Sequence, residues 1–168
     1  MGKARLKSDL ALALTKTERI GDIHSSDKLK GSESTYFSES SRIYLQEAVP
    51  RAKLSFMNTL TLNKFDIYSR LSYFGKVTDP NTGVADGITK VDANGHPVYG
   101  GKVITDASVS YAFTKMFRLT VGANNLFDTY PDKNLASLTS GDQFIYSRAV
   151  SQFGFAGRYL FARVNLTF

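Results

Sequence analysis

The stretch that decides the fold is Val103–Phe127, which reads VITDASVSYAFTKMFRLTVGANNLF. It contains two runs in which apolar and polar side chains alternate, separated by the short segment Thr114-Lys115-Met116. A period of two residues is typical of a β-strand that has one apolar and one polar face. Two such runs joined by three residues predict an antiparallel hairpin.

Working outward from this hairpin, four more segments show the same alternation, interrupted only locally, as at Asn58. Each segment has about ten to thirteen residues. That is longer than the roughly five or six residues usual in soluble sheets and matches the roughly nine to eleven of a tilted membrane strand. The six strands predicted along the chain are 7–18, 51–62, 65–77, 103–113, 117–127 and 157–168.

The connections between these strands alternate in length. Long segments at 19–50, 78–102 and 128–156 alternate with tight turns at Asn63-Lys64 and Thr114–Met116. Outer-membrane barrels have short periplasmic turns and long extracellular loops. The expected fold is therefore all-β: an antiparallel, up-and-down transmembrane β-barrel segment of about six strands, with the C-terminus and both tight turns in the periplasm.

Aromatic residues are expected to form two girdles at the membrane surfaces. The periplasmic girdle would contain Phe65, Phe113, Phe117 and Phe168, and the outer girdle Tyr73, Phe74, Phe127 and Tyr159.

Composition excludes several classes of protein. The net charge of +6 comes from scattered residues with no basic block, so nucleic-acid binding is not expected. The chain has no cysteine, which excludes disulfides and thiolate metal sites. The longest clean apolar run, Leu10–Leu14, is too short for a membrane helix. No convincing helix is predicted, and because the first residues lack a secretory signal, a barrel of this kind would derive from a longer precursor.

No catalytic, cofactor or metal constellation can be assembled from the sequence. The two histidines, His24 and His96, lie far apart in predicted loops. Asp92 and Asn94 precede His96 in an oxygen-rich loop, but the spacing does not fit a calcium-binding loop. We expect no enzyme activity and no cofactor.

The end of the predicted hairpin carries a motif. Val121-Gly122-Ala123-Asn124-Asn125-Leu126-Phe127-Asp128-Thr129-Tyr130-Pro131 resembles a G-x-N-N-L-F-D-x-x-Y signature found near the end of TonB-dependent outer-membrane receptors. Residues 154–168 resemble the last strand of those receptors, and the likeness covers most of the chain from about Val49. We interpret Asn124, Asn125, Leu126, Phe127 and Asp128 as structural, because Asn and Asp stabilise turns where a strand meets a loop.

The resemblance implies a 22-stranded barrel plugged by an N-terminal domain, which imports scarce solutes such as siderophores, cobalamin, haem or oligosaccharides with energy delivered by TonB. This chain has neither a plug nor a TonB-contacting segment, so all of residues 1–168 are expected to be the C-terminal part of such a barrel. The expected partners are the lipid bilayer and lipopolysaccharide, the plug and upstream strands, TonB through that plug, and the outer-membrane assembly machinery.

The final strand resembles the signal read by that assembly machinery. Its apolar residues alternate up to an aromatic end, and an exposed apolar edge strand is a natural template for pairing. The residues concerned are Leu160, Ala162, Val164, Leu166 and Phe168.

In each strand, the charged residues that alternate with the apolar ones are predicted to face the barrel lumen. Two interpretations remain open for them, namely ion pairing between the wall and the plug, and contact with the passing solute. The lumen-facing candidates are Asp66, Arg70, Asp106, Arg118 and Arg163.

Two alternatives come from other classes. A small soluble, lipocalin-like ligand-binding β protein would have short loops at both ends of its sheet, against the alternation seen here. An outer-membrane enzyme would need a carboxylate or Ser/His constellation at the outer rim, which the sequence does not supply.

Overall fold

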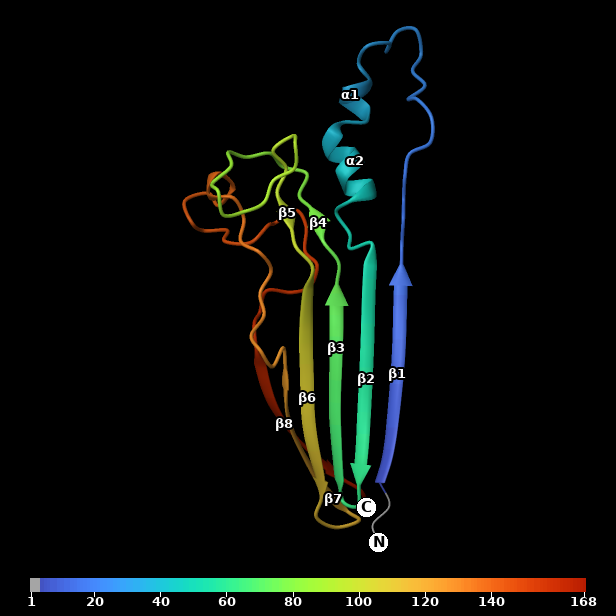
Figure 1. Ribbon diagram of the computed structural model, residues 1–168, viewed down its shortest axis with the longest axis vertical. Coiled ribbons are helices and arrows are strands. Elements are labelled where there is room, and N and C mark those ends of the chain that lie inside the picture. The colour runs from blue at the N-terminus through green and yellow to red at the C-terminus, as the bar shows by residue number, and fades with distance from the viewer. Residues whose placement is uncertain (1–3) are drawn as a thin grey trace.

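The computed structural model describes residues 4–168 and consists mainly of one antiparallel sheet (Figure 1). All six predicted strands are present, and their order in the sheet follows the chain, with only the short ribbon β4–β5 set apart. The all-β, up-and-down antiparallel prediction is therefore confirmed. The strands of the sheet are β1 Ala4–Leu14, β2 Ala52–Leu62, β3 Phe65–Phe74, β6 Lys102–Ala112, β7 Phe117–Asn124 and β8 Tyr159–Leu166.

The strand ends differ from the prediction at several points. β1 covers Ala4–Leu14 and not 7–18, because its partner β2 begins at Ala52, directly opposite Leu14. β3 ends at Phe74 and not at residue 77, and β8 begins at Tyr159 and not at 157. In each case the last paired residue of a neighbouring strand sets the end, and alternation alone does not reveal it.

The two tight turns lie at one end of the sheet and every long connection lies at the other (Figure 1). Asn63 adopts a positive φ of 52° in the first turn, a conformation that asparagine tolerates well. In the second turn the Thr114 hydroxyl accepts hydrogen bonds from the backbone N–H groups of Met116 and Phe117, at 3.1 and 3.0 Å. The predicted alternation of connection lengths is thus present in three dimensions.

Strand register places apolar side chains of different strands in rows across one face of the sheet. Leu60 pairs with Ile67, Ile67 with Val109, Val109 with Val121, and Val121 with Ala162. Because successive residues of a strand point to opposite faces, the residues between them form a polar face. We call the two surfaces the apolar face and the polar face.

The expectation of no helix is wrong for the first long loop, which contains α1 Glu33–Tyr36 and α2 Glu39–Gln46. The Ser38 hydroxyl caps α2 by accepting from the Ser41 N–H at 3.2 Å. Ile43 is its one fully buried side chain, so α2 has no broad apolar stripe. A one-turn 3₁₀ helix, Ala136–Leu138, lies in the third long loop. No helix within residues 4–168 has the length and apolar character to cross a membrane.

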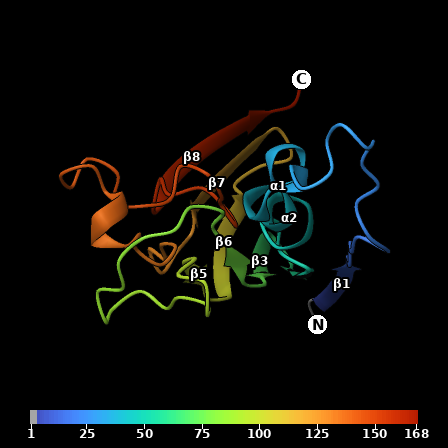
Figure 2. The same cartoon turned by 90° about the horizontal axis from the view of Figure 1, so that it is seen from above.

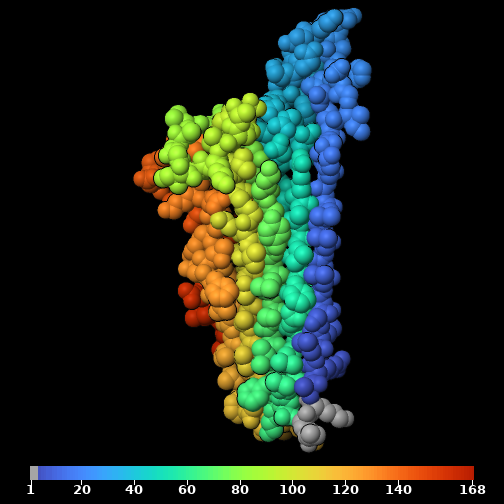
Figure 3. All heavy atoms as spheres, in the orientation of Figure 1, coloured from blue at the N-terminus to red at the C-terminus, as the bar shows by residue number. Residues whose placement is uncertain are grey.

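Above the sheet, the second and third long loops lie together, and the first loop rises beside them and contacts them near the end of α2 (Figure 3). We call the three loops the cap. The ribbon of β4 Val77–Thr78 and β5 Val98–Tyr99 extends from the ends of β3 and β6. Val77 and Tyr99 form a small core with Ala48 and Val150 from the other two loops. The Tyr99 hydroxyl donates to Asn134 Oδ1 at 2.8 Å, and burial raises the pKa of this phenol.

The sheet is open. Seen from above, its strands follow a curved line from β1 to β8 (Figure 2). Within residues 4–168, β1 pairs only with β2 and β8 only with β7. Each terminal strand therefore presents one edge whose backbone groups lack a strand partner.

Candidate functional site

The polar face gathers the five charged residues selected from the sequence. Arg70 pairs in register with Asp106, Asp66 with Ser110, Ser110 with Thr120, and Thr120 with Arg163. Arg118 lies on the same face, opposite Ala112. Residues that are up to 97 positions apart in the chain thus form one charged surface.

Arg70 and Asp106 form one ion pair on this face. Arg70 donates to Asp106 Oδ2 from Nε at 2.8 Å and from Nη2 at 2.5 Å. The Asn125 backbone N–H donates to the other carboxylate oxygen at 2.8 Å. Asp106 is only 5% exposed, and a buried charge of this kind requires such partners.

Asp66 and Arg118 form a second ion pair that crosses β6, since Asp66 lies on β3 and Arg118 on β7. The Thr61 hydroxyl of β2 donates to Asp66 Oδ1 at 2.7 Å. This chain of contacts links three strands, β2, β3 and β7, and fixes both charged side chains.

Arg163 has no carboxylate partner within residues 4–168. Its guanidinium lies 5.9 Å from the centre of the Phe161 ring. Together with Arg118 and Asn165 it lines a hollow of about 390 Å³ on the polar face. The hollow offers arginine N–H donors, which suit anionic or hydroxyl-rich partners.

Gly122 makes room for Phe161 beside this hollow. A Cβ at Gly122 would come within 2.7 Å of the Phe161 ring and 2.6 Å of the Ser108 Cβ. Because both distances are shorter than a normal carbon–carbon contact, the Phe161 ring can occupy this place only if residue 122 is glycine.

The motif from Asn124 to Asp128 forms the junction where β7 meets the third long loop. Asn125 has a positive φ of 50°, and its amide side chain exchanges two hydrogen bonds of 2.8 Å with the backbone of Thr129. Leu126 N–H donates to Thr105 O at 2.7 Å. Asp128, also at positive φ, accepts from the Arg158 N–H at 2.8 Å.

These bonds tie the end of β7 to β6 and to the start of β8. Phe127, by contrast, is 72% exposed. The hydrogen bonds of Asn125 and Asp128 are those of a turn that joins a strand to a loop.

In the last strand, Leu160, Ala162, Val164 and Leu166 lie on the apolar face by register. Phe168 follows the strand and is fully exposed. The Thr167 N–H still bonds Met116 O at 2.9 Å, so the chain end stays beside the tight turn. The outer edge of β8 is the one that the sequence analysis identified as a pairing template.

Two residues of the predicted outer girdle are placed differently. Phe74 pairs with Lys53 and Lys102, and Tyr159 pairs with Asn124, so both lie on the polar face. At the tight-turn end, by contrast, the rings form a row with neighbouring centres 4.6 to 5.2 Å apart, in the order Phe65, Tyr111, Phe113, Phe117. The prediction for the outer end was wrong because it considered how far along the strand each aromatic residue lies, and not which face of the sheet its side chain points to.

Sequence reasoning also missed the segment that folds back over the polar face. The Phe153 ring lies 5.5 Å from that of Phe74. Gln152 Nε2 donates to Gly75 O at 2.5 Å and Gly100 O at 2.8 Å, closing the gap where β3 and β6 diverge. No local signal predicts contacts across 77 residues of chain.

The described residues, 4–168, contain no cluster of three or more His, Cys, Asp or Glu side chains able to hold a metal ion. Comparison with protein-family models, with curated proteins and with solved structures found no match.

Proposed function

We propose that this chain is part of the wall of an outer-membrane β-barrel, and that this barrel is a receptor for TonB-dependent, energy-coupled import of a scarce solute. The observation that carries the proposal is the register, which aligns an exposed apolar face on one side of the sheet and an ion-paired polar face on the other. The motif at Asn124–Asp128 and the final strand supply the resemblance to the receptor family.

The exposed apolar face supports a lipid environment. Leu6, Leu10 and Leu12 are 65%, 69% and 59% exposed, although burying such side chains is the main driving force for folding in water. A soluble lipocalin-like protein would turn this face inward around a ligand. In a bilayer the same face needs no protein cover.

The free edges support completion by further strands. Unpaired backbone groups in hydrocarbon cost several kcal/mol each, so spanning sheets close into barrels. Strands that pair with β1 and β8 would remove this cost. The polar face would then border the lumen, where its ion pairs meet a plug or the passing solute.

The loops would form the extracellular part of the receptor. Their shared core holds them together as one cap, in the place where a solute is first gathered. The resemblance to the receptor family implies that the solute is a siderophore, cobalamin, haem or an oligosaccharide.

The absence of cysteine allows a direct topology test with single-cysteine variants. Asn94→Cys lies at a β-turn of the second long loop, and Lys115→Cys lies in the second tight turn. In intact cells a membrane-impermeant maleimide should label Asn94→Cys. Lys115→Cys should react only after the outer membrane is permeabilised. Equal labelling of both sites in intact cells would refute the proposed topology.

The import function is tested by uptake of radiolabelled solutes of the four classes, in cells with and without the gene and with and without TonB. Uptake of one of these solutes should require both the gene for this protein and TonB. Uptake that continues without TonB would rule out energy-coupled import.

A further inference from the structure

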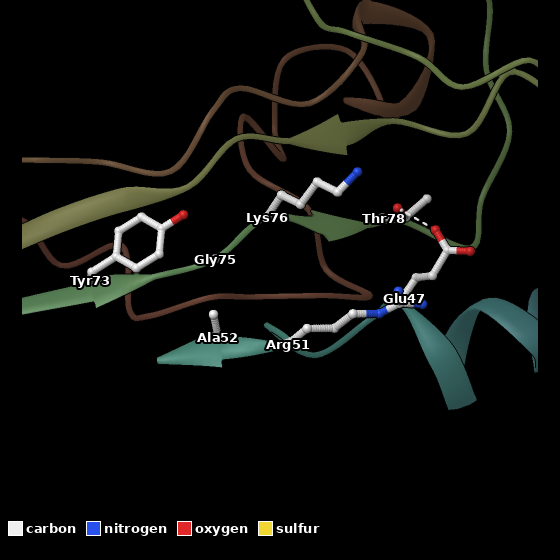
Figure 4. Close-up of a pocket in the computed structure, with 7 residues that line it drawn as sticks. All are labelled: Glu47, Arg51, Ala52, Tyr73, Gly75, Lys76 and Thr78. Carbon is white, nitrogen blue, oxygen red and sulfur yellow. Dashed lines mark hydrogen bonds between the residues drawn. The ribbon is translucent and has the colours of Figure 1, made fainter. Parts of the chain in front are cut away.

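A second hollow, of about 380 Å³, lies where the sheet meets the loop cap (Figure 4). One wall is formed by the segment from Glu47 to Ala52, between α2 and β2. The other is formed by the segment from Tyr73 to Thr78, between β3 and β4. None of the polar-face charges described above lines it.

This hollow opens on the apolar side of the sheet. Ala52 lies opposite Leu14 and Tyr73 opposite Leu54, both in apolar parity. Gly75 shares that parity, and its N–H bonds Ala52 O at 2.8 Å. A Cβ at Gly75 would lie 3.1 Å from that oxygen, so the missing side chain keeps the two walls close and the hollow open.

Its height along the sheet matches the edge of a bilayer. Eleven residues separate Lys76 from Phe65 at the tight-turn end, which is roughly 36 Å of extended chain. At the strand tilt of about 40° found in such barrels, this length rises roughly 28 Å along the membrane normal. An outer-membrane barrel has an apolar band about 25 Å tall. The hollow therefore begins where the apolar band ends.

Two cations line the hollow. Lys76 and Arg51 come from opposite walls, and both are exposed (Figure 4). Arg51 Nε donates to Gln46 O at the end of α2, at 3.2 Å, which orients the guanidinium. Neither cation has an ion-pair partner within residues 4–168.

Glu47 supplies the one carboxylate among the residues that line the hollow, and both of its oxygens already accept hydrogen bonds. Glu47 Oε1 accepts from Arg42 at 2.7 Å and Oε2 accepts from the Thr78 hydroxyl at 2.8 Å. The hydrogen bond from Arg42 holds the pKa of Glu47 below its usual range. Its charge still attracts Arg51 through space, but within residues 4–168 Glu47 forms no ion pair with Arg51 or Lys76, so both cations stay available to an anion.

We infer that this hollow binds the phosphate of a membrane-lipid headgroup in the leaflet next to the long loops, with Arg51 and Lys76 as its cationic ligands. The Tyr73 ring lies at the same level, where amphipathic rings are favoured at a membrane surface. The inference rests on the proposed membrane location and adds a specific lipid contact to it.

The test measures partition of the full chain into vesicles by flotation. One set of vesicles contains dioleoylphosphatidylglycerol, and the other a dioleoyl lipid with a glucose headgroup and no phosphate. The variant is Arg51→Gln with Lys76→Gln. The control, Lys28→Gln with Lys30→Gln, removes the same charge from exposed positions in the first long loop. Circular dichroism verifies equal strand content.

We expect the chain to prefer the phospholipid, and the Arg51/Lys76 variant to lose that preference about tenfold, given the usual strength of cation–headgroup attraction. The Lys28/Lys30 control should change it less than about twofold. Equal losses in both double variants, or no preference in the unmodified chain, would overturn the inference. Competition by free inorganic phosphate at 10 mM would overturn the lipid as the source of the phosphate.

The lipid inference and the proposed function fail in different ways. If the chain associates with both vesicle types to the same extent, the lipid-phosphate site is ruled out, but the proposal that the chain is part of a membrane barrel still holds. No association with either vesicle removes both.

Discussion

The sheet and the loop cap of this molecule differ in where their apolar side chains lie. The cap contains a small buried core, in which Leu135 is 0% exposed and Val77 is 1% exposed, although other apolar loop residues, such as Ile88 at 85%, are exposed. In the sheet, Leu10 is 69% exposed, whereas the carboxylate of Asp106 is almost fully covered. One chain therefore contains a region with a small buried apolar core and a sheet with an exposed apolar face, and the boundary between them coincides with the ends of the strands next to the long loops.

This contrast explains how each region is held together. The cap relies on side-chain contacts between distant loops, such as the hydrogen bond from Ser147 to Asp79. The sheet relies on backbone pairing, with ion pairs on one face only. Substitutions of the same kind should thus have different effects in the two regions.

The largest effect is expected for Leu135→Ala in the cap. Truncating a fully buried leucine removes apolar contacts and leaves a cavity, which costs about 2–5 kcal/mol. Leu10→Ala on the apolar face leaves no cavity, because lipid fills the space, so it should cost only the transfer free energy of the removed carbons, about 2 kcal/mol, and less than Leu135→Ala. Hydrogen exchange of the Leu138 amide, bonded to Leu135 O, reports the first, and urea unfolding in vesicles reports the second. Similar costs for both variants would break the contrast.

Next in size is Leu71→Arg, on the apolar face. A charge that points into the apolar band of a barrel costs about 2–4 kcal/mol at the bilayer centre and less toward its edges. Its neighbour Ser72 points to the polar face, so Ser72→Arg is the matched control and should cost clearly less. Urea titrations in phospholipid vesicles measure both. A larger loss for Ser72→Arg would mean that the faces are assigned the wrong way round.

A smaller effect is expected for Asp106→Asn on the polar face. Arg70 would lose its carboxylate, at a cost of about 1–3 kcal/mol for hydrogen bonds to a charged group. Asp9→Asn removes one partner of the Lys7–Asp9 pair, whose side chains are both exposed, and should cost no more than about 1 kcal/mol. The same titrations compare the two, and equal losses would show that the polar face is as solvated as an ordinary surface.

The smallest effect concerns the pH response of the cap. Because the pKa of Glu47 is lowered from 4.5 by its hydrogen bonds to Arg42 and Thr78, the folded state favours the carboxylate. The resulting stability is present above about pH 4.5 and is lost as the pH falls through the lowered value. Hydrogen exchange of the Thr78 amide, which bonds Glu47 O, should accelerate over that range. Glu47→Gln should exchange faster at neutral pH and lose the pH response.

The sheet could be predicted from the sequence because its signal is local. Alternation identifies a strand wherever one face is apolar, and the motif at Asn124–Asp128 marked its own turn. The placement of Asp66, Arg70, Asp106, Arg118 and Arg163 on one face followed from parity alone.

The cap could not be predicted in the same way. α2 buries only Ile43 and exposes Tyr44 and Leu45, so it lacks the amphipathic stripe by which helices are found. Its capping residue Ser38 was the one local signal. The contacts of Gln152 with Gly75 and Gly100 depend on where the loops meet in space, which no short window of sequence contains.

The most direct test of the account is a nitroxide scan along β6 in phospholipid vesicles, with single cysteines introduced from Val103 to Tyr111. Oxygen gathers in lipid and a nickel chelate in water, so the ratio of their collision rates reports the environment of each position. We predict that the ratio alternates, high at Val103, Thr105, Ala107, Val109 and Tyr111 and low at the residues between them. A ratio without a period of two, or one in which water reaches both sets equally, would contradict the account.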